Sequence, residues 1–180
     1  MDFLEKDLED IIWENLGKEN VRKLYDKGLD LFSIINEINS SQDIIESPLM
    51  KYRQLKIGNY GIADIVLVEK NYDYGFKGEI VPGIDIYIIE LKKGKIDLNA
   101  IKQTYRYKIG IERYLRQRGI KLHNIKIYPV VIGKKINEDH DWVYMAESLD
   151  NLRVFSYNYA IDGLSFEEET FYYHLIDEGF

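Results

Sequence analysis

The chain of 180 residues has no cysteine, only three prolines and no long apolar segment. The absence of cysteine excludes disulfides, thiolate zinc sites, iron–sulfur ligation and a cysteine nucleophile, while hard-ion chemistry stays open. No segment approaches the ~18 uninterrupted apolar residues of a membrane-spanning helix. The first residues are acidic where a signal peptide is basic and then apolar. We therefore expect a soluble, cytoplasmic protein with no membrane association.

Hydrophobic residues make up 46% of the chain, aromatic residues 13% and charged residues 31%. A chain of this size and composition buries enough apolar surface to offset its ordering entropy. The sequence has no internal repeat, low-complexity tract or proline-rich linker. We therefore expect residues 1–180 to form one domain, with a core over about 3–132 and a β extension over about 140–180.

Charge is distributed unevenly along the chain. The net charge is −7, yet residues 51–135 hold 18 Lys and Arg against 8 Asp and Glu, so the middle is basic and both ends are acidic. One interpretation is a basic face that attracts phosphates. The other is a solvated surface helix that happens to lie in the middle of the chain, and charge alone does not decide between them.

Hydrophobic periodicity predicts the elements of the core. Apolar residues at helical spacing indicate helices over 3–16, 19–39 with a break near Gly28, and 97–118. The expected strands cover 50–57, 61–68, 84–91 and 125–132, separated by turns at 58–59, 71–78 and 82–83. The core order is therefore α-β-β-β-α-β, which indicates an α/β fold.

Further short strands are expected in the C-terminal extension, over Trp142 to Met145, Arg153 to Ala160 and Leu164 to Phe166. The acidic residues 167–169 are expected to open a last helix or tail.

Two apolar strands carry charged residues that need an explanation. Side chains alternate along a strand, so Glu90 and Lys92, at the end of the strand over 84–91, project to the same side. Asp64 interrupts the start of another apolar strand. Burying these groups costs stability unless a cation or hydrogen bonds satisfy them. Asp85, at the opposite end of its strand from Glu90, is expected to be exposed.

If the two strands are neighbours, the carboxylates of Asp64 and Glu90 converge, and their repulsion raises one pKa until a cation binds. Oxygen ligands of this kind suit Mg²⁺ or Mn²⁺, which keep several waters and leave room for a substrate phosphate. Lys92 can then orient the attacking water and stabilise charge on the phosphate. Together these are the parts of a phosphodiesterase.

Asp64 followed by Glu90-Leu91-Lys92 resembles the signature of the PD-(D/E)xK nuclease superfamily, which includes restriction endonucleases and Holliday-junction resolvases. The order of elements over residues 3–132 resembles the superfamily core as well. Ala63 stands where the signature usually has proline. The resemblance implies a restriction-endonuclease-like fold, with a mixed central β-sheet flanked by helices.

The resemblance also implies roles for individual residues. Asp64 and Glu90 would bind the metal together with the backbone carbonyl of Leu91, and Lys92 would assist the nucleophile. Glu5 lies on the first helix, where many members of the superfamily place an additional acid. Glu9 is a rival for this role one helical turn later, and an acid in the first turn also stabilises a helix by itself.

Gln103 and Tyr107 resemble a Gln-x-x-x-Tyr element on the helix that follows the motif strand. Residues one turn apart share a helix face, so both can point at the site. Gln103 would orient Lys92, water or phosphate. Tyr107 is expected to contact nucleic acid, although Thr104, Tyr107 and Ile111 also continue an apolar stripe that fits a plain core.

Lys102, Arg106, Arg113 and Arg116 form one stripe down the same helix. This stripe fits a track for phosphates, with Lys102, Arg106 and Arg113 as nucleic-acid contacts. A solvated helix face opposite the apolar stripe explains any single member equally well.

These residues predict a Mg²⁺-dependent deoxyribonuclease that hydrolyses phosphodiester bonds with a metal-activated water; Mn²⁺ would serve as an alternative ion. The alternative is a catalytically silent module with the nuclease fold that binds nucleic acid or protein. A third interpretation is a metal-dependent hydrolase of nucleotides or another phosphoester. The expected partner is DNA, and a homodimer fits the cutting of two strands. The sequence does not decide between DNA and RNA, between endonuclease and exonuclease action, or what sequence is cut.

Overall fold

The structure of the chain is a computed structural model that describes only part of the sequence. The described residues are 5–16, 22–23, 49–74, 77–136, 145–146, 148–160 and 163–169. Within these ranges the main elements are two α-helices, a seven-stranded mixed β-sheet and a separate two-stranded sheet. The chain therefore has the α/β architecture that its sequence indicates.

The elements follow one another along the chain in an order that contains the expected core. They are α1 (Glu5–Asn15), β1 (Arg22–Lys23), β2 (Met50–Lys56), β3 (Ile62–Tyr74), β4 (Ile80–Leu91), β5 (Lys95–Ile96), α3 (Leu98–Gln117), the 3-10 helix η1 (Leu122–Asn124), β6 (Ile125–Gly133), β7 (Lys135–Ile136), β8 (Arg153–Ala160) and β9 (Gly163–Glu168).

The large sheet has the strand order β1-β2-β3-β4-β6-β8-β9. β2, β3 and β4 are antiparallel neighbours, whereas β4 pairs parallel with β6, and β6 pairs parallel with β8. Helix α3 makes the long connection that two adjacent parallel strands require. The strands that carry Asp64 and Glu90 are therefore direct neighbours near the middle of the sheet.

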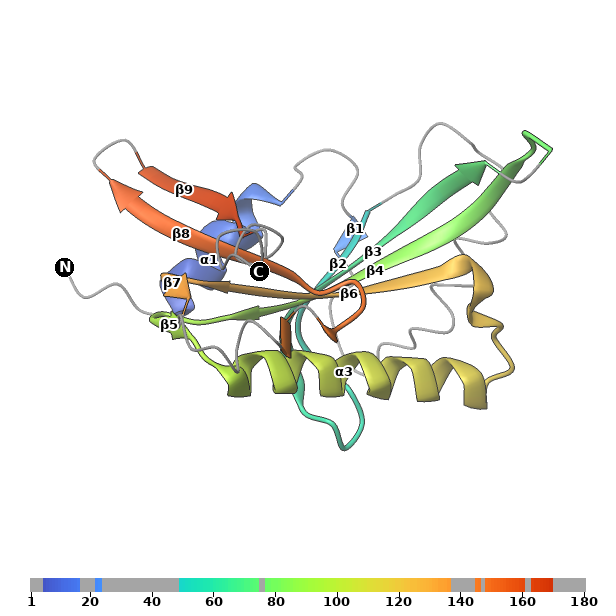
Figure 1. Ribbon diagram of the computed structural model, residues 1–180, viewed down its shortest axis with the longest axis horizontal. Coiled ribbons are helices and arrows are strands. Elements are labelled where there is room, and N and C mark those ends of the chain that lie inside the picture. Colours follow the sequence, from blue (N-terminus) through green and yellow to red (C-terminus); the bar gives the residue numbers. More distant parts are fainter. Residues whose placement is uncertain are drawn as a thin grey trace, which may run out of the picture.

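The two helices cover opposite faces of this sheet, as Figure 1 shows. Tyr107 and Ile111 of α3 pack in one core cluster with Ile86 and Ile88 of β4. A second cluster joins Leu8 and Ile12 of α1 to Ile65, Leu67, Ile89 and Leu91 on the other face. Because successive side chains of a strand alternate between faces, even-numbered residues of β4 face α3 and odd-numbered residues face α1.

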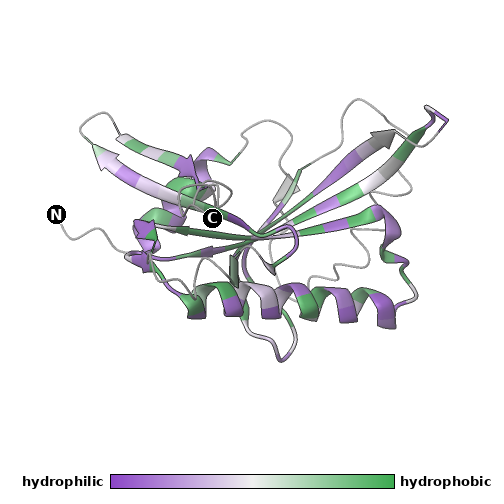
Figure 2. Cartoon of the chain, in the orientation of Figure 1, coloured by the Kyte–Doolittle hydropathy of each residue, from purple (hydrophilic) through white to green (hydrophobic). Residues whose placement is uncertain are grey.

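Helix α3 has clear boundary signals in the sequence. The Asp97 side chain caps its first turn, with Oδ1 accepting from the Ala100 N–H at 2.9 Å. Gly119 follows with φ +76°, a left-handed conformation that commonly ends a helix. Green and purple residues alternate along α3 in Figure 2, as a helix with one buried face requires. The expected helix over 97–118 is confirmed to within one residue at each end.

Within the described ranges, no helix combines the length and the apolar character needed to cross a membrane.

The expected turns at 71–78 and 82–83 are wrong in extent. β3 continues to Tyr74 and β4 already begins at Ile80, so the two strands form a long hairpin with Pro82 paired to Tyr72 inside it. Proline is tolerated there because β4 pairs with β6 only from Ile84 onward. On that side of β4, no neighbouring strand needs a hydrogen bond from the backbone nitrogen of residue 82.

Three other expectations need correction or fall outside the description. Arg22 and Lys23 form strand β1 where a helix is expected, and the rest of 19–39 lies outside the described residues. Residues 137–144 also lie outside the described residues, and they include most of the strand expected over 142–145. Glu167 and Glu168 belong to β9 rather than to a last helix or tail, because β9 pairs with β8 and Glu168 accepts from Arg153 at 2.8 and 2.9 Å.

Candidate functional site

The structure places Asp64 and Glu90 side by side across two strands. The register of β3 with β4 pairs Ile65 with Ile89, so Asp64 and Glu90 occupy the next position toward the strand ends. Glu90 lies on the face of the sheet that packs against α3, and Asp64 reaches the backbone N–H of the neighbouring residue, Leu91. Glu90 is only 3% exposed and Asp64 is half-buried. The convergence of the two acids that the strand pattern indicates is therefore present.

Asp64 is held by two hydrogen bonds. Its Oδ2 accepts from the Leu91 N–H at 2.8 Å, and its Oδ1 accepts from Gln54 Nε2 at 3.1 Å. Burial raises the pKa of Asp64, and the negative charges of Glu9 and Glu5 raise it further, against the effect of the two hydrogen bonds. A nearby cation would favour the charged form of Asp64 and so oppose this rise of its pKa.

Glu90 is an incompletely satisfied buried carboxylate. Its Oε1 accepts from Lys92 Nζ at 2.8 Å, whereas its Oε2 accepts no hydrogen bond from any residue that the structure describes. Burial raises the pKa of Glu90 to about 7, and the charges of Asp64 and Glu5 add to the shift although Lys92 opposes it. A buried oxygen without a partner is costly, and this one lies near the charges of Asp64 and Glu5, an arrangement that a bound cation would stabilise.

Lys92 keeps its positive charge in this setting. Burial disfavours the ammonium, but the hydrogen bond to Glu90 and the charges of Glu90, Glu5 and Asp64 outweigh burial and raise the pKa of Lys92. Near neutral pH the side chain is therefore a donor and a cation rather than a base.

Helix α1 brings two more acids to the same end of the sheet. Glu5 Oε2 accepts from the Lys93 N–H at 3.2 Å, one residue beyond Lys92. Glu9 is 9% exposed and accepts from Arg53, and also from Gln54 Nε2 at 3.0 Å. Glu5, for which a role is expected, and its rival Glu9 therefore both adjoin the site. Only Glu9 shares a hydrogen-bond partner, Gln54, with Asp64.

Gln103 and Tyr107 adjoin the acids from helix α3. Tyr107 donates its hydroxyl proton to the Ile62 carbonyl at 2.8 Å and accepts from Gln103 Nε2 at 2.6 Å. Burial raises the pKa of Tyr107, with contributions from the charges of Glu90 and Asp64. The expected contact between Tyr107 and nucleic acid is wrong, because the side chain is only 1% exposed and packs in the core.

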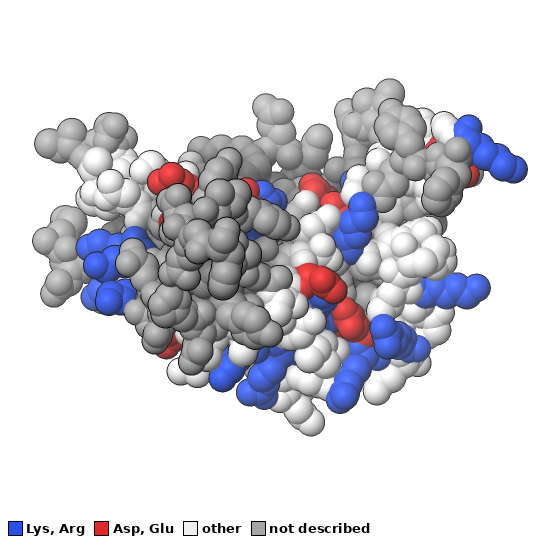
Figure 3. Space-filling model, in the orientation of Figure 1, with Lys and Arg blue, Asp and Glu red and all other residues white. Residues whose placement is uncertain are grey.

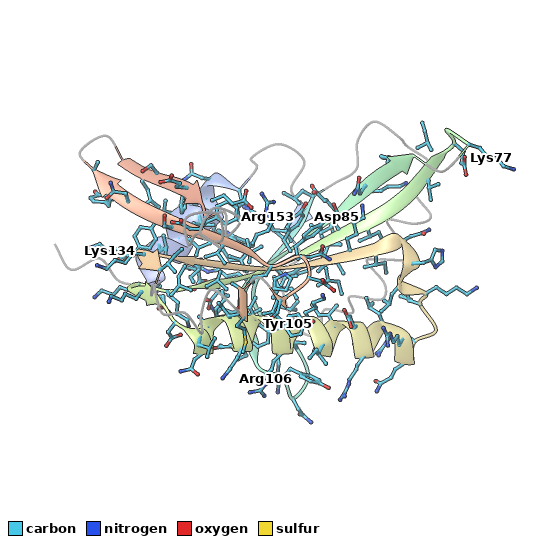
Figure 4. The ribbon with its side chains drawn as sticks, viewed as in Figure 1. Lys77, Asp85, Tyr105, Arg106, Lys134 and Arg153 are labelled. Atoms are coloured by element: carbon cyan, nitrogen blue, oxygen red, sulfur yellow. The ribbon has the colours of Figure 1, made fainter. Side chains whose placement is uncertain are left out.

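The expected phosphate contacts lie on the outer side of α3. Lys102, Arg106 and Arg113 are exposed, and Figure 3 shows Lys and Arg side chains along the edge of the molecule that α3 forms. Arg106 projects away from the sheet in Figure 4. Arg113 Nη1 donates to the Tyr60 hydroxyl at 2.8 Å. These positions are compatible with the expected track for phosphates.

The structure adds site residues that the sequence does not single out. Arg53 binds both Glu9 and Asp10 and so ties α1 to β2. Gln54 bridges Glu9 and Asp64 from a backbone with φ +52°, which is uncommon for a residue other than glycine. The hydroxyl of Tyr157 donates to the Lys93 carbonyl at 2.7 Å. The polar pair Arg53-Gln54 within a strand is the only local sign of these contacts.

Asp85 is buried, so the expectation that it is exposed is wrong. It is 7% exposed, and its Oδ2 accepts from Asn71 Nδ2 at 3.0 Å. The long β3–β4 hairpin supplies this partner, since Asn71 belongs to the part of β3 that the sequence places in a turn. Asp85 lies on the face opposite Glu90 and takes no part in the site.

The residues present fit a hard divalent cation. In the described part of the chain no three His, Asp or Glu side chains are grouped closely enough to hold an ion by themselves. Mg²⁺ does not need such a cage, because it usually keeps several waters and binds one or two carboxylates. Glu90 Oε2 is a buried oxygen with a free lone pair beside a second carboxylate, Asp64, whose pKa is also raised. The backbone of Leu91 adjoins the same carboxylate through its N–H.

No family model matches this chain, and neither a curated protein nor a solved structure matches it. The fold and site define an α/β protein with a mixed sheet and a cluster of acids and a lysine at the ends of two neighbouring strands. Any finer assignment depends on the geometry of that cluster.

Proposed function

We propose that the chain is a metal-dependent nuclease of the PD-(D/E)xK type that hydrolyses phosphodiester bonds in DNA. The observation that carries the proposal is the Glu90 carboxylate, which is 3% exposed, has one oxygen without a described partner and adjoins Asp64 and Lys92. A protein that only binds other molecules gains nothing from this arrangement and loses stability through it. The order α1-β2-β3-β4-α3-β6 supports the proposal.

Each group has a defined task in this proposal. Asp64 and Glu90 would hold the cation through carboxylate oxygens, and the Leu91 carbonyl would complete the protein ligands. When bound, Mg²⁺ lowers the pKa of a water and offsets charge on the phosphate. Lys92 remains protonated and donates to a phosphate oxygen as negative charge develops there. Glu5 accepts a hydrogen bond from the Lys93 N–H at the edge of the site.

Gln103 acts on the site indirectly. Its amide N–H donates to the Tyr107 hydroxyl at 2.6 Å. It therefore positions Tyr107, which anchors the start of β3 through the Ile62 carbonyl. This contact holds the strand that carries Asp64 against α3.

Cleavage of supercoiled plasmid and of single-stranded circular DNA, with Mg²⁺ or Mn²⁺ and with EDTA, tests the proposal. Asp64→Ala, Glu90→Ala and Lys92→Ala are each expected to lower the cleavage rate about 100-fold or more, because each removes a charge that acts on the transition state. Glu79→Ala and Lys77→Ala are matched controls at the tip of the β3–β4 hairpin, where Figure 4 shows Lys77. They are expected to cut like the parent.

Each result has a distinct meaning. Equal cleavage by the parent and all three site variants would show that these residues are not the active site. A parent that binds DNA but shows no metal-dependent cleavage would favour the catalytically silent binding module. Cleavage of nucleotides or simple phosphoesters in place of DNA would identify a different hydrolase.

A further inference from the structure

A pocket lies beside the proposed active site, between the turn that joins β2 to β3 and the C-terminal half of α3. Its volume is about 340 Å³, and its lining includes Ile57, Tyr60, Ile111, Arg113 and Tyr114. The walls combine two aromatic rings with aliphatic side chains, and exposed cationic groups stand at the mouth.

The pocket depends on a glycine in the middle of a helix. A Cβ at Gly110 would lie 2.7 Å from Tyr60 Cδ2 and 2.8 Å from Ile57 Cγ2, closer than such atoms approach. The bare backbone at Gly110 therefore lets the turn and the Tyr60 ring lie directly against α3. Glycine at an interior helix position costs about 1 kcal/mol relative to alanine, and this close contact offsets that cost.

Each tyrosine of the pocket is paired with an arginine. Arg113 Nη1 donates to the Tyr60 hydroxyl at 2.8 Å, and the Arg118 guanidinium lies 4.1 Å from the centre of the Tyr114 ring. Both arginines are exposed. Along α3 five Lys or Arg accompany a single acid, Glu112. The surroundings of the pocket are therefore cationic and complement a polyanion.

The pocket and the acids share a structural element. Gly61, in the same turn as Tyr60, packs so closely on Tyr107 that a Cβ there would lie 2.8 Å from Tyr107 Cε1. Tyr107, whose pKa responds to Glu90 and Asp64, is two helical turns from Tyr114, or about 10 Å along the axis. A strand cut at the acids and running along α3 therefore passes over the pocket within a few nucleotides.

We propose that this pocket holds an unpaired base of single-stranded DNA, stacked on Tyr60 or Tyr114. Exposed cationic groups at its mouth, Lys56 and Arg113, then lie close to the flanking phosphates. The proposal rests on the nuclease function above and narrows its substrate to DNA that is single-stranded or unpaired near the cut. Aromatic rings serve as stacking platforms because every base offers a π-face, and a basic groove tracks the backbone. A base inside duplex DNA is not available to such a pocket.

The test is fluorescence anisotropy with a labelled single-stranded 12-mer and the matching duplex, both in EDTA. Tyr60→Ala and Tyr114→Ala are each expected to weaken single-strand binding about tenfold and to leave duplex binding unchanged, because one stacking contact is lost. Tyr60→Phe and Tyr114→Phe are expected to bind like the parent. Tyr105→Ala, on the same helix but outside the pocket lining, is the matched control.

A second measurement needs no variant. A single strand carrying 5-iododeoxyuridine is expected to photo-crosslink to Tyr60 or Tyr114 of the parent. Crosslinks mapped only to other residues, alanine variants that bind single strands like the parent, or equal losses for both DNA forms would each overturn the pocket assignment. Because binding is measured without metal, the result is independent of cleavage: loss of cutting in Asp64→Ala with intact single-strand binding tests the nuclease proposal alone.

Discussion

At the scale of single residues, Glu90 shows most clearly that the site lowers the stability of the folded protein when no cation is bound. The carboxylate is 3% exposed, and its pKa rises from an ordinary 4.5 to about 7. Burial is the main cause, and the negative charges of Asp64 and Glu5 add to it. Lys92 donates a hydrogen bond to Oε1 of Glu90, but this bond does not compensate for the burial of Oε2. A bound cation would convert this unfavourable group into a ligand.

This shift makes stability depend on pH in a defined direction. The folded state binds the Glu90 proton more tightly than the unfolded state, so without metal the free energy of unfolding falls as pH rises from about 4.5 to about 7. Glu90→Gln cannot lose a proton. Relative to the parent, the free energy of unfolding of this variant is expected to increase across this pH window by up to about 3 kcal/mol.

Urea denaturation in EDTA at a series of pH values measures this difference. The pH dependence of the difference isolates Glu90, because all other titrating groups are common to both proteins. Parallel stability profiles for the parent and Glu90→Gln would show that the Glu90 pKa is not raised in the folded state.

At the scale of elements, the sequence predicts what depends on local signals. The bounds of α3 follow from the Asp97 cap and from Gly119, and both act within one helical turn. β8 has the expected bounds, Arg153–Ala160, because its pattern of β-forming residues is also local. The central strands are found as well, and their alternation correctly places Glu90 on the face shared with Lys92.

Features that depend on long-range pairing could not be predicted from the sequence. The outer part of β3, residues 69–74, is mainly polar, and the outer part of β4 contains Pro82 and Gly83, yet both stay extended because the two strands pair with each other as far as Tyr74 and Ile80. Arg53 and Gln54 reach the site only because α1 packs over β2 and β3, and Tyr157 arrives from a strand on the far side of β6. No local pattern encodes these neighbours. The roles expected for the acids and Lys92 stay predictions until activity is measured.

The turn between β2 and β3 gives a prediction about an element. Gly61 has φ +128°, and a Cβ there would lie 2.8 Å from Tyr107 Cε1, whereas no described atom lies within 4 Å of a Cβ at Gly58, whose φ is +50°. Gly58→Ala is expected to cost only backbone strain, about 1 kcal/mol. Gly61→Ala is expected to cost about 2 kcal/mol more, because the Tyr107 ring must also move.

Chemical denaturation of the two variants beside the parent provides the comparison. The proposed cleavage activity is expected to be lower in Gly61→Ala than in Gly58→Ala at a temperature where both are folded, since Tyr107 anchors the start of β3. Equal losses of stability in the two variants would mean that the contact between Gly61 and Tyr107 does not constrain the turn.

At the scale of the whole molecule, the distribution of charge suits a phosphate-binding surface. The chain has a net charge of −7, but residues 51–135, which include β3, β4 and α3, have ten more basic than acidic residues. Lys102 and Arg106 of α3 are exposed, and Figure 4 shows Arg106 on the side of the helix that faces away from the sheet. If the proposed function is right, these basic residues would attract a polyanion to α3 despite the overall negative charge.

Salt dependence measures this surface. The logarithm of the affinity for single-stranded DNA is expected to fall linearly with the logarithm of the salt concentration. Each phosphate contact contributes about 0.7 to the magnitude of this slope. The double variant Lys102→Ala/Arg106→Ala is expected to reduce the slope by about 1.4, while Lys77→Ala leaves it unchanged. A double variant with the parent's slope would show that these residues do not contact phosphates.

The most direct test of the metal site is a crystal soaked with Mn²⁺ and measured for anomalous scattering, since Mn²⁺ binds the oxygen ligands that suit Mg²⁺. An ion is predicted between one carboxylate oxygen from each of the two neighbouring strands, Asp64 and Glu90, and its peak should vanish in Asp64→Ala crystals treated in the same way. A map with no peak at that position, with the two carboxylates turned apart into solvent, would contradict the account.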